Sequence, residues 1–217
     1  MSLTFPSGVS RRVNRIVLTL TLAFGAVGLA VLAILGLIVG DGGTGAASLV
    51  YGLTLAACTL FSFLYNMWET APARKLLRLL DHAAIFLLIA GTYTPFAAAD
   101  IPGPLGGSLL QWVWALAALG IALKLCLPPA HDRVFVICYL AVGWLFVSSL
   151  GDIIARVPTI PLVLLAVGGS VYTVGAVLYA RDIGRWTDPV WHGCVLTGTV
   201  THYLAVIVFV LAPIAVV

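Results

Sequence analysis

SFLYNMWETAPARKLLRLLDHAAIFLLIAGTYTP, residues 62–95, is the stretch that decides the fold. One long apolar segment ends within it, a short basic connection follows, and a second apolar segment opens at Asp81. Polar side chains flank the connection, because Ser62 and Asn66 precede it. The stretch therefore contains the end of one membrane helix and the start of the next, with polar residues near both.

The composition places the whole chain in a membrane. Hydrophobic residues make up 62% of the 217 residues and charged residues only 9%, whereas soluble domains carry roughly a quarter charged residues. A helix needs about 20 apolar residues to cross a bilayer, so the chain has room for roughly seven helices. The apolar runs are continuous, which excludes the alternating pattern of a membrane β-barrel.

The sequence predicts an all-α bundle of seven transmembrane helices. Residues 1–15 form a basic N-terminal segment and residues 16–217 a single membrane domain. The first apolar run is too long for the core of a signal peptide, so we expect it to be a retained helix. The predicted spans are Ile16–Gly40, Ser48–Met67, Leu80–Ala99, Ser108–Leu127, Val134–Leu150, Pro158–Ala180 and Val190–Val217.

The basic residues predict the orientation, since Lys and Arg are retained on the cytoplasmic side of a membrane. With a cytoplasmic N-terminus and an outside C-terminus, ten of the eleven basic residues are cytoplasmic and only Arg156 lies outside. The ten are Arg11, Arg12, Arg15, Arg74, Lys75, Arg78, Lys124, Arg133, Arg181 and Arg185. Topology thus accounts for the basic residues, and we expect no nucleic-acid partner.

This topology brings five polar residues to the same membrane depth: Asn66, Asp81, His82, Asp188 and His192. Ser62 and Asn66 are four residues apart on one face of the second span, and Asp188 and His192 are spaced in the same way on the last span. Asp81 opens the third span at the same side. Ionisable groups are costly within a bilayer, so they generally face the bundle interior and indicate a function.

Each of these residues also has a structural interpretation. Asp81 and Asp188 are both suited to capping a helix N-terminus, the latter with Pro189 at the first helical position. His202 lies about 15 Å further along the last span than His192, so we expect it to make a separate, structural contact. The small residues from Gly168 to Tyr179 favour a helix-packing face.

Several motifs together resemble one family, the hemolysin III family, which is the bacterial branch of the progestin and adipoQ receptors. The motifs are Ser62-x-x-x-Asn66, Leu80-Asp81-His82-Ala-Ala-Ile85, Ile89-Ala-Gly-Thr-Tyr-Thr-Pro95-Phe96, Gly-Gly-x-x-Tyr-x-x-Gly-x-x-x-Tyr from Gly168 to Tyr179, Trp191-His192 and His202-Tyr203. The resemblance implies a multi-pass protein of the bacterial inner membrane, with a cytoplasmic N-terminus and a zinc site near the cytoplasmic side.

The resemblance also implies a ligand set, from which this chain departs. The family pattern has Ser-x-x-x-His on span two, Asp on span three and His-x-x-x-His on span seven, and the three His bind zinc. Ser62, Asp81 and His192 match, whereas Asn66 and Asp188 replace two of the His. The implied metal ligands are His192, Asp188 and Asp81, with Asn66 contributing weakly or through water.

Two functions follow as alternatives. The first is a zinc-dependent, ceramidase-like hydrolase of a lipid amide, in which Asp81 serves as general base and Ser62 supports the carbonyl. The second is a non-enzymatic sensor or regulator of the membrane, or a cytolytic protein, in which the metal site is degenerate. Both have a membrane lipid as partner. No polar stripe runs through the spans, which argues against a constitutive channel.

Overall fold

The structure, a computed structural model, describes residues 8–38, 42–68, 70, 72–97, 106–127 and 132–211, and all regular elements within these ranges are helical. The α-helices are α1 (Gly8–Ile38), α2 (Gly42–Met67), α3 (Ala73–Ala97), α4 (Gly106–Cys126), α5 (Asp132–Gly143), α6 (Leu150–Arg156), α7 (Thr159–Arg181) and α8 (Thr187–Leu211). Two 3₁₀ helices, η2 (Leu145–Ser149) and η3 (Gly184–Trp186), connect them.

Six of the described helices are long and apolar enough to cross a membrane: α1, α2, α3, α4, α7 and the helix formed by η3 with α8. They agree with six of the predicted spans, although several begin earlier than predicted. The fifth predicted span, Val134–Leu150, is not one continuous helix. The described chain instead has the 12-residue α5, then η2 and the short α6.

Tyr93 on α3 explains why the fifth span breaks. Its hydroxyl lies 2.8 Å from the carbonyl oxygen of Gly143 and 3.1 Å from that of Val142, and it accepts a hydrogen bond from the backbone N–H of Phe146 at 3.0 Å. Backbone groups at membrane depth need partners inside the protein, and this hydroxyl supplies them where the helix ends. The partner lies about 50 residues away in the sequence.

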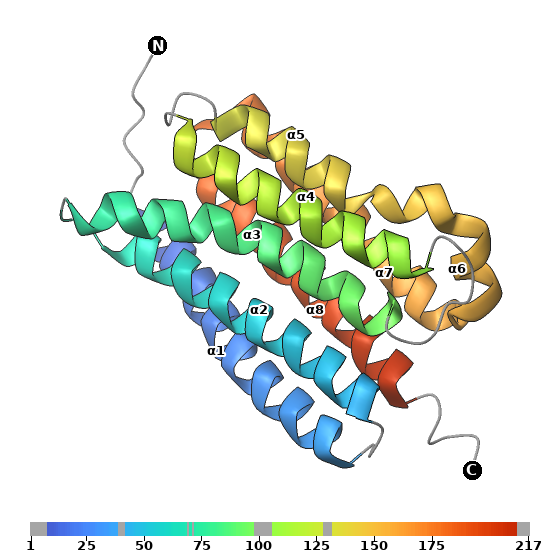
Figure 1. The fold of residues 1–217 in the computed structure, drawn as a ribbon. Coiled ribbons are helices and arrows are strands. Elements are labelled where there is room, and N and C mark those ends of the chain that lie inside the picture. Colours follow the sequence, from blue (N-terminus) through green and yellow to red (C-terminus); the bar gives the residue numbers. More distant parts are fainter. Residues whose placement is uncertain are drawn as a thin grey trace.

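The long helices lie side by side along a common direction, and α6 lies at one end of the bundle (Figure 1). Consecutive helices α1 to α4 pack against one another, and α8 packs between α1 and α7 while also contacting α2 and α3. The short helix α5 lies against α3, α4 and α7. This arrangement places the starts of α1, α3 and α8 and the end of α2 at one end of the bundle, which we call the basic end because it carries Arg12, Arg74 and Arg185.

The predicted packing face on the sixth span is confirmed. A Cβ atom on Gly168 would lie 2.5 Å from Cδ2 of His202, and one on Gly175 would lie 2.6 Å from Cβ of Cys194. Both neighbours belong to α8. Helix pairs in lipid associate through such close approach rather than through burial of apolar surface, so these glycines fix how α7 sits against α8.

Candidate functional site

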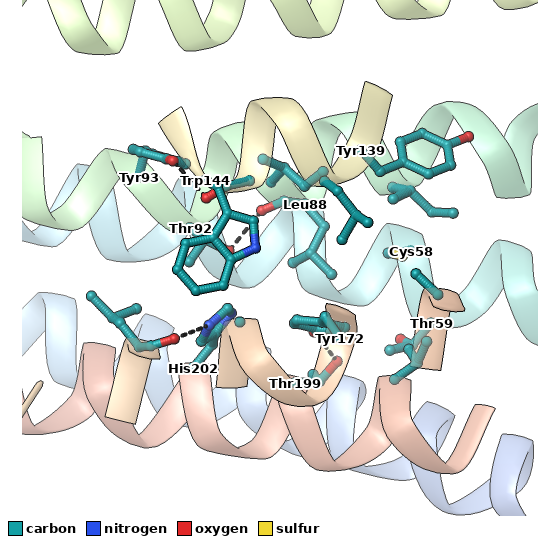
Figure 2. A pocket seen from close by; sticks show the side chains of 18 of the residues that line it. Cys58, Thr59, Leu88, Thr92, Tyr93, Tyr139, Trp144, Tyr172, Thr199 and His202 are labelled. Atoms are coloured by element: carbon teal, nitrogen blue, oxygen red, sulfur yellow. Dashed lines mark hydrogen bonds between the residues drawn. The ribbon is translucent and has the colours of Figure 1, made fainter. Parts of the chain in front are cut away.

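An elongated cavity of about 220 Å³ runs along the inside of the bundle. Its lining on α3 extends from Asp81 to Phe96, a distance of about 22 Å along the helix. The remaining walls come from α1, α2, α5, α6, α7 and α8. Most lining side chains are apolar, and two groups of polar side chains lie among them. Figure 2 shows one of these groups, around His202.

The first polar group lies toward the basic end and consists of Ser62, Asp81 and His192, each from a different helix. We call it the polar end of the cavity. The Ser62 hydroxyl is hydrogen-bonded to the Asp81 carboxylate. Asp81 lies eight residues inside α3, which begins at Ala73. The proposed capping role for Asp81 is therefore wrong, because the carboxylate is more than two turns from the helix N-terminus.

Asn14 of α1 is hydrogen-bonded to His192 of α8. Nδ1 of His192 lies 2.7 Å from Oδ1 of Asn14, and the His192 ring also bonds to the backbone of Asp188. An amide oxygen only accepts hydrogen bonds, so Nδ1 carries the proton and Nε2 keeps a lone pair. His192 lines the cavity and is 8% exposed. The polar end thus presents an imidazole acceptor beside a carboxylate.

Two of the predicted ligands do not reach the cavity. The side-chain amide of Asn66 donates to the carbonyl oxygen of Ser62 in its own helix at 2.8 Å, and Asn66 is not among the lining residues. Asp188 is exposed, lies in the first turn of α8, and is also absent from the lining. The side chains of Asn66 and Asp188 therefore do not join those of Ser62, Asp81 and His192 in the cavity lining.

The turn before α8 explains where Asp188 lies. Asp182 adopts a left-handed conformation with φ of 52° and ends α7. Its Oδ1 accepts hydrogen bonds from the backbone N–H of Gly184 at 3.2 Å and from the hydroxyl of Thr187 at 3.0 Å. These hydrogen bonds fix the start of α8. Asp188 follows in its first turn, where a negative charge interacts favourably with the positive end of the helix dipole.

Sequence reasoning missed two residues near this site. Asn14 lies among the arginines of the N-terminal segment, where no pattern marks it as a site residue. Its partner His192 is 178 residues away in the sequence. Lys124 of α4 was treated as a topological residue, yet it is only 7% exposed. Its Nζ lies 4.6 Å from the centroid of the Phe135 ring, and its charge attracts the Asp81 carboxylate. A lysine inside the predicted apolar span Ser108–Leu127 is the sequence signal that could have identified it.

The donor set does not fit zinc. Structural and catalytic zinc sites use three or four protein ligands, but only Asp81 and His192 of the four predicted ligands line the cavity. Within the described ranges, no group of three or more His, Cys, Asp or Glu side chains could hold a metal ion. The zinc site inferred from the resemblance stays a prediction.

The second polar group surrounds His202, the last residue of α8 in the cavity lining (Figure 2). Nε2 of His202 lies 3.1 Å from the carbonyl oxygen of Leu165, and the ring centroid is 5.3 Å from that of Tyr172. The Tyr172 hydroxyl is paired with that of Thr199 at 2.8 Å. The predicted structural contact of His202 is present, and the side chain also lines the cavity.

Comparison with known proteins gives one family. The family model described as haemolysin-III related matches residues 13–203. Hemolysin-3 of Bacillus cereus is 35% identical over 162 residues, which cover 75% of this chain and 74% of that protein. The Hemolysin-3 homolog of Bacillus subtilis (strain 168) is 31% identical over 160 residues, covering 74% and 75%. The human monocyte to macrophage differentiation factor is 27% identical over 166 residues, covering 72% and 67%. No solved structure matches the chain.

Proposed function

The chain belongs to the haemolysin-III related family, and from this membership and its cavity we propose that it is a non-enzymatic membrane protein that binds a single-chain lipid between its helices. Lipid occupancy would make it a sensor or regulator of the membrane. The elongated cavity is the observation that carries this proposal. An elongated, mostly apolar cavity with a polar end suits a lipid with one acyl chain and a small head group.

The chemistry of the polar end favours one class of head group. Asp81 offers carboxylate oxygens and His192 offers the lone pair of Nε2, so both are acceptors. A lipid whose head carries hydroxyl donors, such as a monoacylglycerol, would satisfy both of them.

The basic residues support an orientation for this site. With Arg12, Arg74 and Arg185 at the basic end, the positive-inside rule favours a cytoplasmic location for that end. The membrane in this proposal is the bacterial inner membrane. The head group would then lie toward the cytoplasmic leaflet, and the acyl chain would enter between helices from the bilayer. The N-terminus is cytoplasmic in this arrangement.

A zinc-dependent lipid amide hydrolase is the second candidate. One observation favours it, because Ser62, Asp81 and His192 of the family pattern do line a single cavity. The donor set argues against it, because Asn66 bonds within α2 and Asp188 is exposed. The retention of zinc by the purified protein separates the two candidates.

Cytolysis, which the names of two relatives suggest, receives less support. A conducting pore needs polar groups along its whole length. The lining of this cavity is instead mostly apolar, with residues such as Ile85, Leu88 and Val195 among its polar side chains. This pattern suits an acyl chain better than a column of ions and water.

Filling the cavity should remove the bound lipid. Ala176 on α7 lines the cavity and is 2% exposed, so Ala176→Phe should occupy the space of the acyl chain. We expect wild-type protein in mild detergent to carry lipid in native mass spectrometry, and the variant to lose most of it. The cost of overpacking is about 1–3 kcal/mol, which leaves scope for the variant to fold.

Val177→Phe is the matched control, because Val177 is the next residue on the same helix and is 41% exposed. This variant should keep the bound lipid at the wild-type level. Equal lipid content in all three proteins would contradict the proposal, because the lipid would then lie on the outer surface of the bundle.

A further inference from the structure

We propose that His202 is a second recognition site of the cavity, which accepts a hydrogen bond from a hydroxyl group carried part-way along the lipid chain. The ligand class is therefore a single-chain lipid with a hydroxylated acyl chain. The inference rests on the proposed function, since it concerns the same cavity. It adds a specificity that an apolar channel alone would not have.

The hydrogen bonding of His202 leaves one ring nitrogen available. Nε2 faces the carbonyl oxygen of Leu165 at 3.1 Å. A carbonyl only accepts, so Nε2 carries the proton and Nδ1 keeps a lone pair. His202 makes no other hydrogen bond to the residues that the structure describes. Among the described residues, the Tyr51 hydroxyl is the one fully buried side-chain nitrogen or oxygen without a hydrogen-bond partner. Nδ1 of His202, which also has no partner, is therefore not fully buried, and His202 lines the cavity.

The surroundings hold this ring in place. A Cβ atom on Gly168 would lie 2.7 Å from Nε2, so the glycine provides the space in which the His202 ring meets α7. Tyr172 packs on the ring with an interplanar angle of 55°, and its own hydroxyl is occupied by Thr199. The ring is thus fixed by three neighbours, and its lone pair is not satisfied by any of them.

An unsatisfied acceptor is costly inside a membrane protein, and a donor on the ligand would remove that cost. The position of this acceptor defines the ligand further. His202 lies ten residues after His192 on α8, which separates the two imidazoles by about 15 Å. A lipid with donors on its head group and a hydroxyl near the middle of its chain would satisfy both.

Monoolein and monoricinolein are a matched pair of probes, because they differ only by a mid-chain hydroxyl. We expect the delipidated, full-length protein in detergent to bind monoricinolein about fivefold more tightly than monoolein, the value of one additional hydrogen bond. Competition measured by native mass spectrometry gives this ratio. Equal affinities for the two lipids in wild-type protein would overturn the inference.

Substitutions at His202 identify the acceptor. His202→Phe should abolish the preference while monoolein still binds, and His202→Gln should keep part of the preference because its amide oxygen accepts a hydrogen bond. A preference that persists in a folded His202→Phe protein would contradict the assignment. If that variant does not fold, the wild-type ratio alone decides.

The two proposals fail in different ways. Wild-type protein that binds neither lipid would overturn the proposed function and this inference with it. Wild-type protein that binds both lipids equally would overturn the inference and leave the proposed function standing. Ala176→Phe serves as a common control, since it should reduce the binding of both lipids by a similar factor.

Discussion

The double substitution Asn66→His and Asp188→His should create a protein that retains about one zinc ion per chain, whereas the wild-type protein should retain far less than one. Both positions carry His in the family pattern. Imidazole is a good zinc ligand, while the neutral amide of Asn66 is a poor one. At position 188, a longer side chain four residues before His192 reaches along the same helical face.

Asn14 gives a further reason to expect this gain. Its Oδ1 accepts the Nδ1 proton of His192 at 2.7 Å and leaves Nε2 free to bind a metal. Such support from an outer hydrogen bond is typical of histidines that bind metals. Elemental analysis after loading with zinc and dialysis measures the result. The control adds His192→Ala to the double substitution, which should lower the zinc content again.

Two outcomes would contradict this prediction. A double variant without zinc would mean that the helices do not bring positions 66, 81, 188 and 192 together. Stoichiometric zinc in the wild-type protein, lost on His192→Ala, would instead favour the hydrolase. In that case, release of fatty acid from a ceramide should depend on Asp81.

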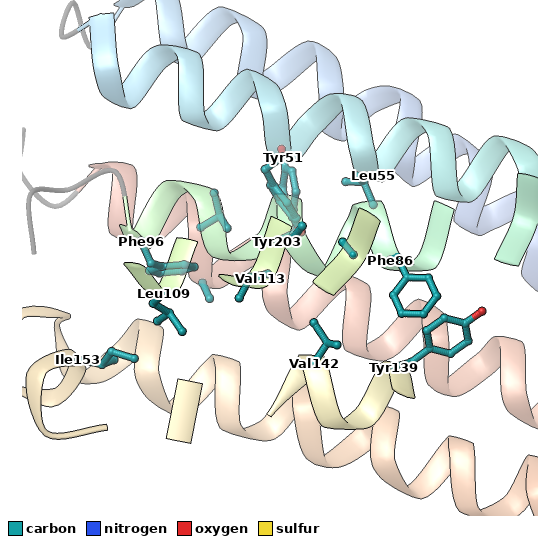
Figure 3. Close-up of a cluster of buried hydrophobic side chains, with 14 of the residues drawn as sticks. Tyr51, Leu55, Phe86, Phe96, Leu109, Val113, Tyr139, Val142, Ile153 and Tyr203 are labelled. Carbon is teal, nitrogen blue, oxygen red and sulfur yellow. The ribbon is translucent and has the colours of Figure 1, made fainter. Parts of the chain in front are cut away.

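The second large effect should come from Gly120→Leu, which should lower the free energy of unfolding by about 3 kcal/mol or more. A Cβ atom at position 120 would overlap the Phe86 ring. Phe86 is fully buried and cannot move aside, because its ring centroid lies 4.6 Å from that of Tyr139 and 6.3 Å from that of Phe135. Figure 3 shows the Phe86 ring beside that of Tyr139. The substitution would therefore force α4 away from α3.

Thermal unfolding in detergent measures this effect, and Ala118→Leu is the matched control. Ala118 lies on the same helix and is exposed, so the added side chain should face lipid at little cost. Similar melting temperatures for Gly120→Leu and wild-type protein would show that α3 and α4 do not pack as described.

The fold was largely predictable, because continuous apolar runs mark membrane helices directly. The break in the fifth predicted span was not predictable, since the apolar residues continue through it. The hydroxyl of Tyr93, on another helix, supplies the hydrogen bonds that let the backbone leave the helix at Gly143. Hydropathy within one segment contains no information about such a partner.

The candidate site was predictable only in part. Topology and the family pattern indicated Ser62, Asp81 and His192, which line one cavity. Helical spacing suggested that Asp188 would join them, but it could not show how the turn at Asp182 sets the start of α8. Asn14 was not predictable, because its role depends on contact between the first and last helices.

Photochemical labelling tests most directly whether a lipid chain lies inside the bundle. A monoacylglycerol with a diazirine in its acyl chain would be bound to the wild-type protein, irradiated, and its adducts located by peptide mass spectrometry. We predict adducts on cavity-lining residues such as Ile85 and Val195. Adducts confined to lipid-facing residues such as Ile137 and Val177, which are 68% and 41% exposed, would contradict an internal lipid site.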